Sequence, residues 1–178
     1  ALTISQVAAR NKIMFMSIGA RSDALRNKDC NRYTFHVDIP VTVMVNAAGE
    51  ALLREGWVKG KKIFALTSDY LFGHDLSRAA KNFFTRNGGS VIGDELVPTD
   101  LTDFSPQLLK IRQARPDLVT TNLGGNQVTN FVKQYSEFGL SFPVAGFNLN
   151  TADAWAAGEG NLGGYWPTVW HHELKTPG

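Results

Sequence analysis

Cysteine is almost absent from the sequence, since Cys30 is the only one among 178 residues. A single cysteine excludes a disulfide bond within the chain. Cys30 lies in a polar stretch, so we expect a free thiol in a loop. The alternative is a half-cystine whose partner lies outside this chain.

Long apolar runs and dense charged runs are also missing. The longest apolar stretches are far too short to span a membrane. The 18 basic and 16 acidic residues are spread along the chain and leave a net charge of +2. Without a basic cluster, we predict neither nucleic acid nor an anionic membrane as a partner.

The first 15 residues lack a basic segment followed by an apolar segment, so we do not expect a signal peptide there. The chain starts with Ala1 inside a segment of helical spacing, which suggests a fragment or a processed product. Its length suits one domain, or one lobe and part of another. A hydrophobic content of 43% indicates that this piece folds around a core.

Motifs of nucleophilic catalysis and of P-loop phosphate binding are not found. The sequence contains no G-x-x-x-x-G-K-[ST] motif and no G-x-S-x-G nucleophile motif. Its carboxylates are scattered, so no acid–base pair can be nominated. His171, His172 and Glu173 are metal-ligand types, but adjacent residues of an extended chain point to opposite sides. We therefore predict no cofactor, no metal and no enzymatic activity; an α/β enzyme sharing only topology is the alternative.

Strand and helix patterns alternate through the chain. The apolar run Ile63–Leu66 predicts a buried strand, and the helical spacing of apolar residues from Phe72 to Phe84 predicts a helix that ends at Gly88. The same reasoning predicts strands at 12–17 (buried), 33–37, 90–97, 118–121, 142–147 and 164–170, and helices at 3–10, 41–55, 105–114 and 126–138. We expect an irregular loop at 24–32 and a short helix within 150–163. This order is typical of an α/β fold, a three-layer αβα arrangement with a mainly parallel, doubly wound sheet.

Four turns that carry small or polar residues follow predicted strands, at 17–22, 67–73, 122–126 and 147–150. Ligands of open α/β sheets bind where strands end, so these turns could line one cleft. Their backbone N–H groups, hydroxyls and amides suit a carboxylate, and Tyr70 and Phe72 could supply an apolar wall. Alternatively, they are ordinary βα loops.

Several blocks of sequence resemble the type I periplasmic solute-binding proteins of ABC transporters, in the branched-chain amino acid class. The blocks are KIMFMSIGARSDAL (12–25), KDCNRYTFHV (28–37), KKIFALTSDYLFGHDL (61–76), FTRNGGSVIG (84–93), DFSPQLLKIRQARPDLV (103–119) and NFVKQYSEFGL (130–140). The resemblance implies two α/β lobes that close over a small ligand. It divides this chain into the end of lobe 1 (1–37), lobe 2 (38–170) and a segment returning toward lobe 1 (171–178).

The resemblance also suggests ligand-binding residues. The turn that holds the ligand carboxylate corresponds to Gly19, Ala20 and Arg21. An aromatic contact corresponds to Phe72, beside Tyr70, and a second contacting loop comprises Gly124, Gly125 and Asn126. Finally, Asn148 stands where amino-acid binders often have an acidic residue for the ligand ammonium.

The function implied is that of a periplasmic receptor that captures a small carboxylate ligand, an amino acid or an aromatic or other organic acid, and delivers it to an ABC transporter permease. A neutral Asn148 cannot make the charge-assisted bond that an ammonium favours. We therefore expect a ligand with a carboxylate and no ammonium. The alternative is a ligand-sensing regulatory domain of the same fold, and direct membrane insertion is not expected.

Overall fold

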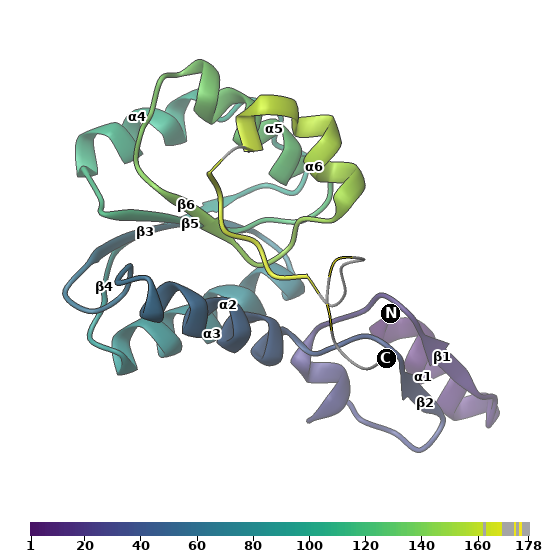
Figure 1. Cartoon of the computed structure of the whole chain (residues 1–178). Coiled ribbons are helices and arrows are strands. Elements are labelled where there is room, and N and C mark those ends of the chain that lie inside the picture. Colours follow the sequence, from purple (N-terminus) through teal and green to yellow (C-terminus); the bar gives the residue numbers. More distant parts are fainter. Residues whose placement is uncertain (162, 169–172, 174, 176–178) are drawn as a thin grey trace.

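The computed structural model describes residues 1–161, 163–168, 173 and 175. Its main feature is a parallel sheet of strand order β4-β3-β5-β6 (Figure 1). The four strands are β3 (Lys62–Ser68), β4 (Ser90–Val97), β5 (Leu118–Asn122) and β6 (Val144–Gly146). Every residue of β5 and β6, and all of β3 after Lys62, is buried. This burial on both sides explains why Ile63–Leu66 of β3 is a continuous rather than an alternating apolar run.

Helices cover both faces of this sheet. In Figure 1, α2 (Val41–Arg54) and α3 (Leu71–Arg86) lie on one side, and α4 (Ser105–Ala114), α5 (Asn126–Glu137) and α6 (Thr151–Ala157) lie on the other. Each side has its own apolar core. Phe83 and Leu52 pack with Ile63 below the sheet, whereas Phe131 and Ile111 pack with Leu66 above it. The predicted three-layer αβα fold is therefore confirmed.

A smaller unit precedes this sheet. It contains α1 (Leu2–Asn11) and the parallel pair β1 (Phe15–Ser17) and β2 (Thr34–His36), and we call it the N-terminal unit. The hydroxyls of Ser5 on α1 and Thr34 on β2 share a hydrogen bond of 2.7 Å. Figure 1 shows this unit beside the four-stranded sheet and apart from its layers. The division of the chain into lobes at residues 37 and 170 stays a prediction.

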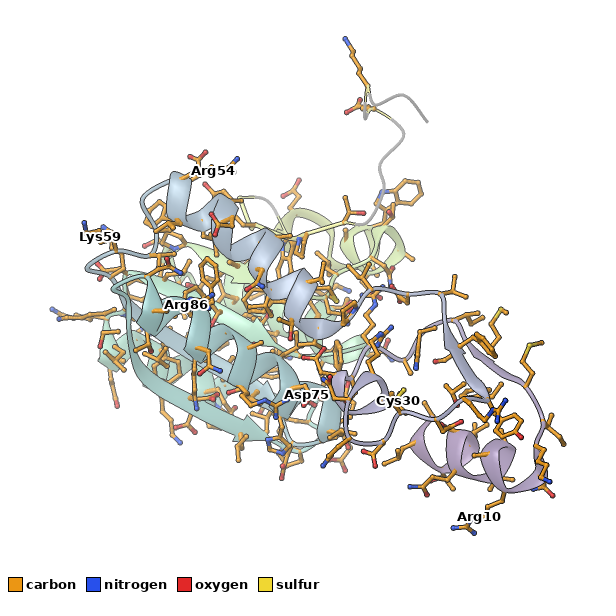
Figure 2. All side chains as sticks on the ribbon, turned by 90° about the horizontal axis from the view of Figure 1, so that it is seen from below. Arg10, Cys30, Arg54, Lys59, Asp75 and Arg86 are labelled. Atoms are coloured by element: carbon orange, nitrogen blue, oxygen red, sulfur yellow. The ribbon has the colours of Figure 1, made fainter. Side chains whose placement is uncertain are left out.

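Side chains that follow β1 fasten this unit to the larger one. The Ser22 hydroxyl donates to Asp75 of α3, and Arg78 pairs with the same carboxylate. Asp75 is 2% exposed. Figure 2 shows it at the end of α3 that faces the N-terminal unit, with Arg86 at the far end. The turn after β1 is thereby held against the start of α3.

Most predicted elements are confirmed, and β4 and α4 have the predicted bounds. The prediction of a buried strand at 12–17 is wrong. Only Phe15–Ser17 is a strand, and Met14 and Met16 are 65% and 52% exposed. Met16 is exposed because α1 covers only one face of the two-stranded sheet. Met16 and its neighbour Phe35, which are both half-exposed, lie on the other face.

The predictions for residues 24–32 and 164–170 also need correction. The loop expected at 24–32 contains a 3₁₀ helix, Asp23–Arg26, which the Ser22 hydroxyl caps by accepting from the Ala24 N–H. In the strand expected at 164–170, Tyr165 makes a single parallel bridge to Ala145, and residues 166–168 form no strand. Residues 169–170, His171, His172 and most of the segment 171–178 lie outside the described residues.

Candidate functional site

A pocket of about 660 Å³ lies where the N-terminal unit meets the four-stranded sheet. Eight of the nine sequence-predicted residues line it: Gly19, Ala20, Arg21, Tyr70, Phe72, Gly124, Gly125 and Asn148. The ninth, Asn126, begins α5 and is not among the lining residues. The four turns expected to share one cleft thus converge, while their contact with a ligand stays a prediction.

A second pocket, of about 380 Å³, lies elsewhere. It is lined by α5, by the residues just before β6 and by Trp57 and Trp166, and it contains none of the nine predicted residues. It opens near the amino end of β6, whereas ligands of open α/β sheets bind at the carboxyl ends of strands. The larger pocket is therefore the better candidate site.

Three neighbouring strand ends form one wall of the candidate site. Tyr70, Gly124 and Asn148 each lie two residues beyond the end of a strand, namely β3, β5 and β6. These strands are adjacent and parallel in the sheet. Their carboxyl ends meet at one edge, so residues far apart in the sequence become neighbours.

Arg21 enters the site from the turn after β1 and reaches both Asp38 and the wall formed by the strand ends. Its Nε donates to Asp38 Oδ2 at 2.6 Å, and its Nη1 donates to Asn148 Oδ1 at 3.2 Å. Asp38 also accepts from the Ile39 N–H at 2.8 Å through its other oxygen, Oδ1. The Arg21 charge is thus balanced by a carboxylate whose two oxygens are both engaged.

Sequence reasoning missed Asp38. It lines the pocket, and its side chain is 14% exposed. A signal was available, because Asp38 comes directly after the strand predicted at 33–37, and polar residues after strands were the criterion for the other turns. Residues 38–40 were interpreted only as the break between a strand and the next helix, so Asp38 was not nominated. Leu25 also lines the pocket without having been predicted, whereas Ser22 belongs to the predicted turn at 17–22.

The Asn148 amide has a defined orientation. Arginine carries only donors, so the atom of Asn148 that faces Arg21 must be the oxygen. The amide nitrogen, a pure donor, then faces the loop after β5. It lies 3.8 Å from the position that a Cβ atom on Gly124 would occupy.

Gly124 is needed for space. A Cβ atom at this position would lie 2.6 Å from the Tyr70 hydroxyl oxygen, closer than real Cβ contacts come. Gly125 is different, because its φ of 55° is left-handed and no atom crowds it. Tyr70 packs near Phe72 with ring centroids 6.0 Å apart, and burial raises the pKa of its phenol. The loop after β5 therefore accommodates a neutral phenol.

The turn after β1 presents unused donors. Within the described part of the chain, the backbone N–H groups of Gly19, Ala20 and Arg21 donate no hydrogen bond. Two carbonyl groups of the same turn are engaged, since Arg21 O accepts from the Val41 N–H at 3.0 Å and Ala20 O accepts from Arg26 at 3.4 Å. A turn whose N–H groups are free, while its carbonyl groups are held by hydrogen bonds, is suited to bind an anion.

Across residues 1–161, 163–168, 173 and 175, no group of three His, Cys, Asp or Glu side chains is placed to hold a metal ion. None of the helices in that part of the chain is long and apolar enough to cross a membrane. Cys30 is exposed and forms no disulfide there.

Comparisons with known proteins agree with this architecture. The family model described as "Periplasmic binding protein" matches residues 1–178. Among curated proteins, the chain is 24% identical over 161 residues to Leu/Ile/Val-binding protein homolog 4 of Brucella abortus, covering 86% of this chain and 38% of that protein.

Solved structures show the same relationship. A periplasmic binding protein from Burkholderia mallei has 31% identity and a TM-score of 0.81, over 88% of this chain and 42% of that one. An ABC-transporter solute-binding protein from Rhodopseudomonas palustris, in complex with 3,4-dihydroxybenzoic acid, has 27% identity and a TM-score of 0.73, over 82% and 39%. The chain spans about two fifths of the length of these relatives. It belongs to the periplasmic binding protein family.

Proposed function

We propose that this chain is the ligand-binding part of an ABC-transporter solute-binding protein, and that the pocket between its two units captures a small carboxylate. The observation that carries the proposal is the pairing of the turn at Gly19–Arg21 with three strand ends across one pocket. Residues 1–37 would then be the end of one lobe and residues 38–170 the other. Residues 171–178 would return toward the first lobe.

The turn after β1 is where the ligand carboxylate binds. Three free backbone N–H groups and the remaining N–H groups of Arg21 are donors of the kind that carboxylates accept from. Because these donors stand on one side and the strand ends on the other, a ligand held by both would favour the closed arrangement of the lobes. The closed form then docks on the permease in the periplasm, and no chemical step is needed.

The charges of the pocket oppose an ammonium group. Among the described residues that line it, Asp38 is the only acid, and both of its oxygens already accept hydrogen bonds. Asn148 presents its amide nitrogen, a donor, toward the loop after β5. An ammonium group would therefore be desolvated beside a carboxylate whose charge Arg21 already balances, which costs free energy. An aromatic or aliphatic acid avoids this cost.

Isothermal titration of the full-length protein with two matched ligands tests the proposal. Leucine and 4-methylpentanoate share a side chain and a carboxylate and differ by the ammonium group. We expect heat of binding from 4-methylpentanoate or benzoate and none from leucine. Tight binding of leucine with no binding of either acid would contradict the predicted ligand class, and binding of none of the three would contradict the carboxylate pocket.

Transport can be tested separately from sensing. Deleting the gene should abolish uptake of the radiolabelled acid that binds, because a solute-binding protein supplies its permease. Normal uptake in the deletion strain, together with altered transcription in response to the acid, would favour the regulatory alternative instead.

A further inference from the structure

Two consecutive residues of the turn after β1 reach two separate points of the larger unit, which contains the four-stranded sheet. Arg21 donates to Asn148 beyond β6, and Ser22 donates to Asp75 near the start of α3. Asp75 is not among the described residues that line the pocket. We propose that Asp75 is a positioning residue, which acts through Ser22 as a latch that forms when the two units close over a ligand. This inference rests on the proposed function, in which the two units belong to different lobes.

Asp75 is a buried charge whose partners come from both units. Its side chain is 2% exposed, and its Oδ2 accepts from the Ser22 hydroxyl of the N-terminal unit. Its Oδ1 pairs with Arg78, which lies on the same helix and is 59% exposed. A buried carboxylate costs free energy unless its oxygens are hydrogen-bonded. When the units separate, water replaces Ser22, so only the closed arrangement depends on this bond.

The Ser22 hydroxyl is held in place to act as a latch. It is part of a side chain that is 7% exposed, and its single hydrogen is donated to Asp75. Its oxygen also accepts from the Ala24 N–H at 3.3 Å, a bond within the N-terminal unit that does not depend on closure. Because Ser22 directly follows Arg21, the bond to Asp75 fixes the free N–H groups of the turn relative to the strand ends.

Asp75 is itself fixed relative to the strand ends. A Cβ atom on Gly73, two residues earlier, would lie 2.0 Å from the carbonyl oxygen of Ser68, so the start of α3 lies directly against the end of β3. The Ser68 hydroxyl in turn donates to Gln127 of α5 at 2.5 Å. The start of α3 therefore moves together with the strand-end wall, and Asp75 offers Ser22 a stationary acceptor.

The latch strengthens binding without contact to the ligand. Hydrogen bonds to a charged group stabilise more than neutral ones, and this bond is made only in the closed form. It therefore slows the release of the ligand, whereas the encounter, which precedes closure, keeps nearly the same rate. Since Asp75 lies outside the pocket, ligands of different shape should be affected by the same factor.

Stopped-flow measurement of ligand association and dissociation with the full-length protein tests the latch. Ser22→Ala should raise the dissociation rate constants of benzoate and of 4-methylpentanoate by about tenfold each, because a buried carboxylate oxygen is left unsatisfied. The association rate constants should stay nearly unchanged. Ser22 also lines the pocket, so the same substitution is made in an Asp75→Ala background. No such oxygen remains there, and Ser22→Ala should change the dissociation rate by about twofold or less.

Ser77→Ala is the matched control. Ser77 is also 7% exposed and donates to Asp94 at 2.6 Å, but both residues belong to the larger unit. The control should lower the free energy of unfolding and leave ligand dissociation unchanged. An equally faster dissociation in Ser77→Ala would show a general loosening of the fold. Equal effects of Ser22→Ala in both backgrounds would show that Ser22 contacts the ligand, and either result overturns the latch.

Failure of the latch is distinguishable from failure of the proposed function. If either acid binds and Ser22→Ala releases it at the wild-type rate, the latch is contradicted while the carboxylate pocket stands. If leucine binds in place of both acids, the predicted ligand class fails, and release of leucine about tenfold faster from Ser22→Ala would support the latch. If none of the three binds, the proposed function and this inference fall together.

Discussion

Arg21 Nη1 donates a hydrogen bond of 3.2 Å to Asn148 Oδ1, across 127 residues of sequence. Arg21 belongs to the turn after β1, and Asn148 lies two residues beyond the end of β6. This bond joins the two walls of the pocket. It also sets the orientation of the Asn148 amide and therefore the chemistry of the strand-end wall. In the proposed function, this pair links anion binding to ligand selectivity.

Removal of the Arg21 guanidinium should weaken carboxylate binding. We expect Arg21→Met to lower the affinity for the acid that binds by about ten- to a hundredfold, the usual effect of losing hydrogen bonds to a charged group. Titration calorimetry measures the change. Arg10→Met is the control, because Arg10 lies on α1 outside the pocket (Figure 2). Equal losses in both variants would show that net charge, rather than the pocket, controls binding.

Introduction of a carboxylate at position 148 should change the ligand class. In Asn148→Asp, one oxygen can still accept from Arg21 and the other can accept from an ammonium group. The affinity of leucine relative to 4-methylpentanoate should rise by about tenfold or more, because charge-assisted bonds exceed neutral ones. Asn150→Asp adds the same charge two residues away and preserves the cap of α6, so it should leave the ratio unchanged. An unchanged ratio in Asn148→Asp would place the amide outside the ligand's reach.

The contact between α2 and α3 depends on a missing side chain. A Cβ atom on Gly49 would lie 2.5 Å from the Phe83 ring, which is itself 2% exposed. Gly49→Ala should therefore destabilise the protein by about 1–3 kcal/mol, although alanine favours a helix. Urea unfolding measures this loss. In the double variant with Phe83→Leu the two costs should be less than additive, because the smaller side chain relieves the clash.

The partly buried carboxylate of Asp94 should make stability depend on acid pH. Burial by itself would raise its pKa, but hydrogen bonds from Lys81, Ser77 and Thr67 and the charge of Lys81 outweigh burial and lower the pKa below the usual value of 3.8. In the unfolded chain the pKa returns to about 3.9. The stabilisation is therefore present above that value and is lost as the pH falls through the lower folded-state pKa.

Comparison of urea unfolding at pH 7 and pH 3 tests this expectation. We expect Asp94→Asn to cost about 1–3 kcal/mol at pH 7, and the difference from wild type to shrink at pH 3. Asp100→Asn, at an exposed position, should cost almost nothing at either pH. A cost that is the same at both pH values would mean that Asp94 stabilises the fold by packing rather than by charge.

The order of elements follows from local pattern. Apolar residues at helical spacing predicted α3 and α5, and the continuous apolar run at Ile63–Leu66 predicted a strand buried on both faces. The same rules failed for β1. Met14 and Met16 belong to an apolar run, as do Ile63–Leu66 of β3. However, no helix of the described chain covers their side of the two-stranded sheet. Periodicity reports the suitability of a residue for burial, and it contains no information on what covers the residue.

The sequence by itself determined which turns follow strands, and hence that Gly19–Arg21, Tyr70, Gly124 and Asn148 were candidates for one site. Parallel strands of one sheet bring the turns that follow them to a common edge, whereas Gly19–Arg21 follow β1 of the separate two-stranded sheet. Only the tertiary structure decided that β3, β5 and β6 are neighbours, that Asp38 balances Arg21, and that Gly124 admits the Tyr70 hydroxyl beside Asn148. These relationships depend on distances between side chains that are far apart in the sequence. The strand order and the packing of the N-terminal unit determine those distances, and local periodicity contains no information about them.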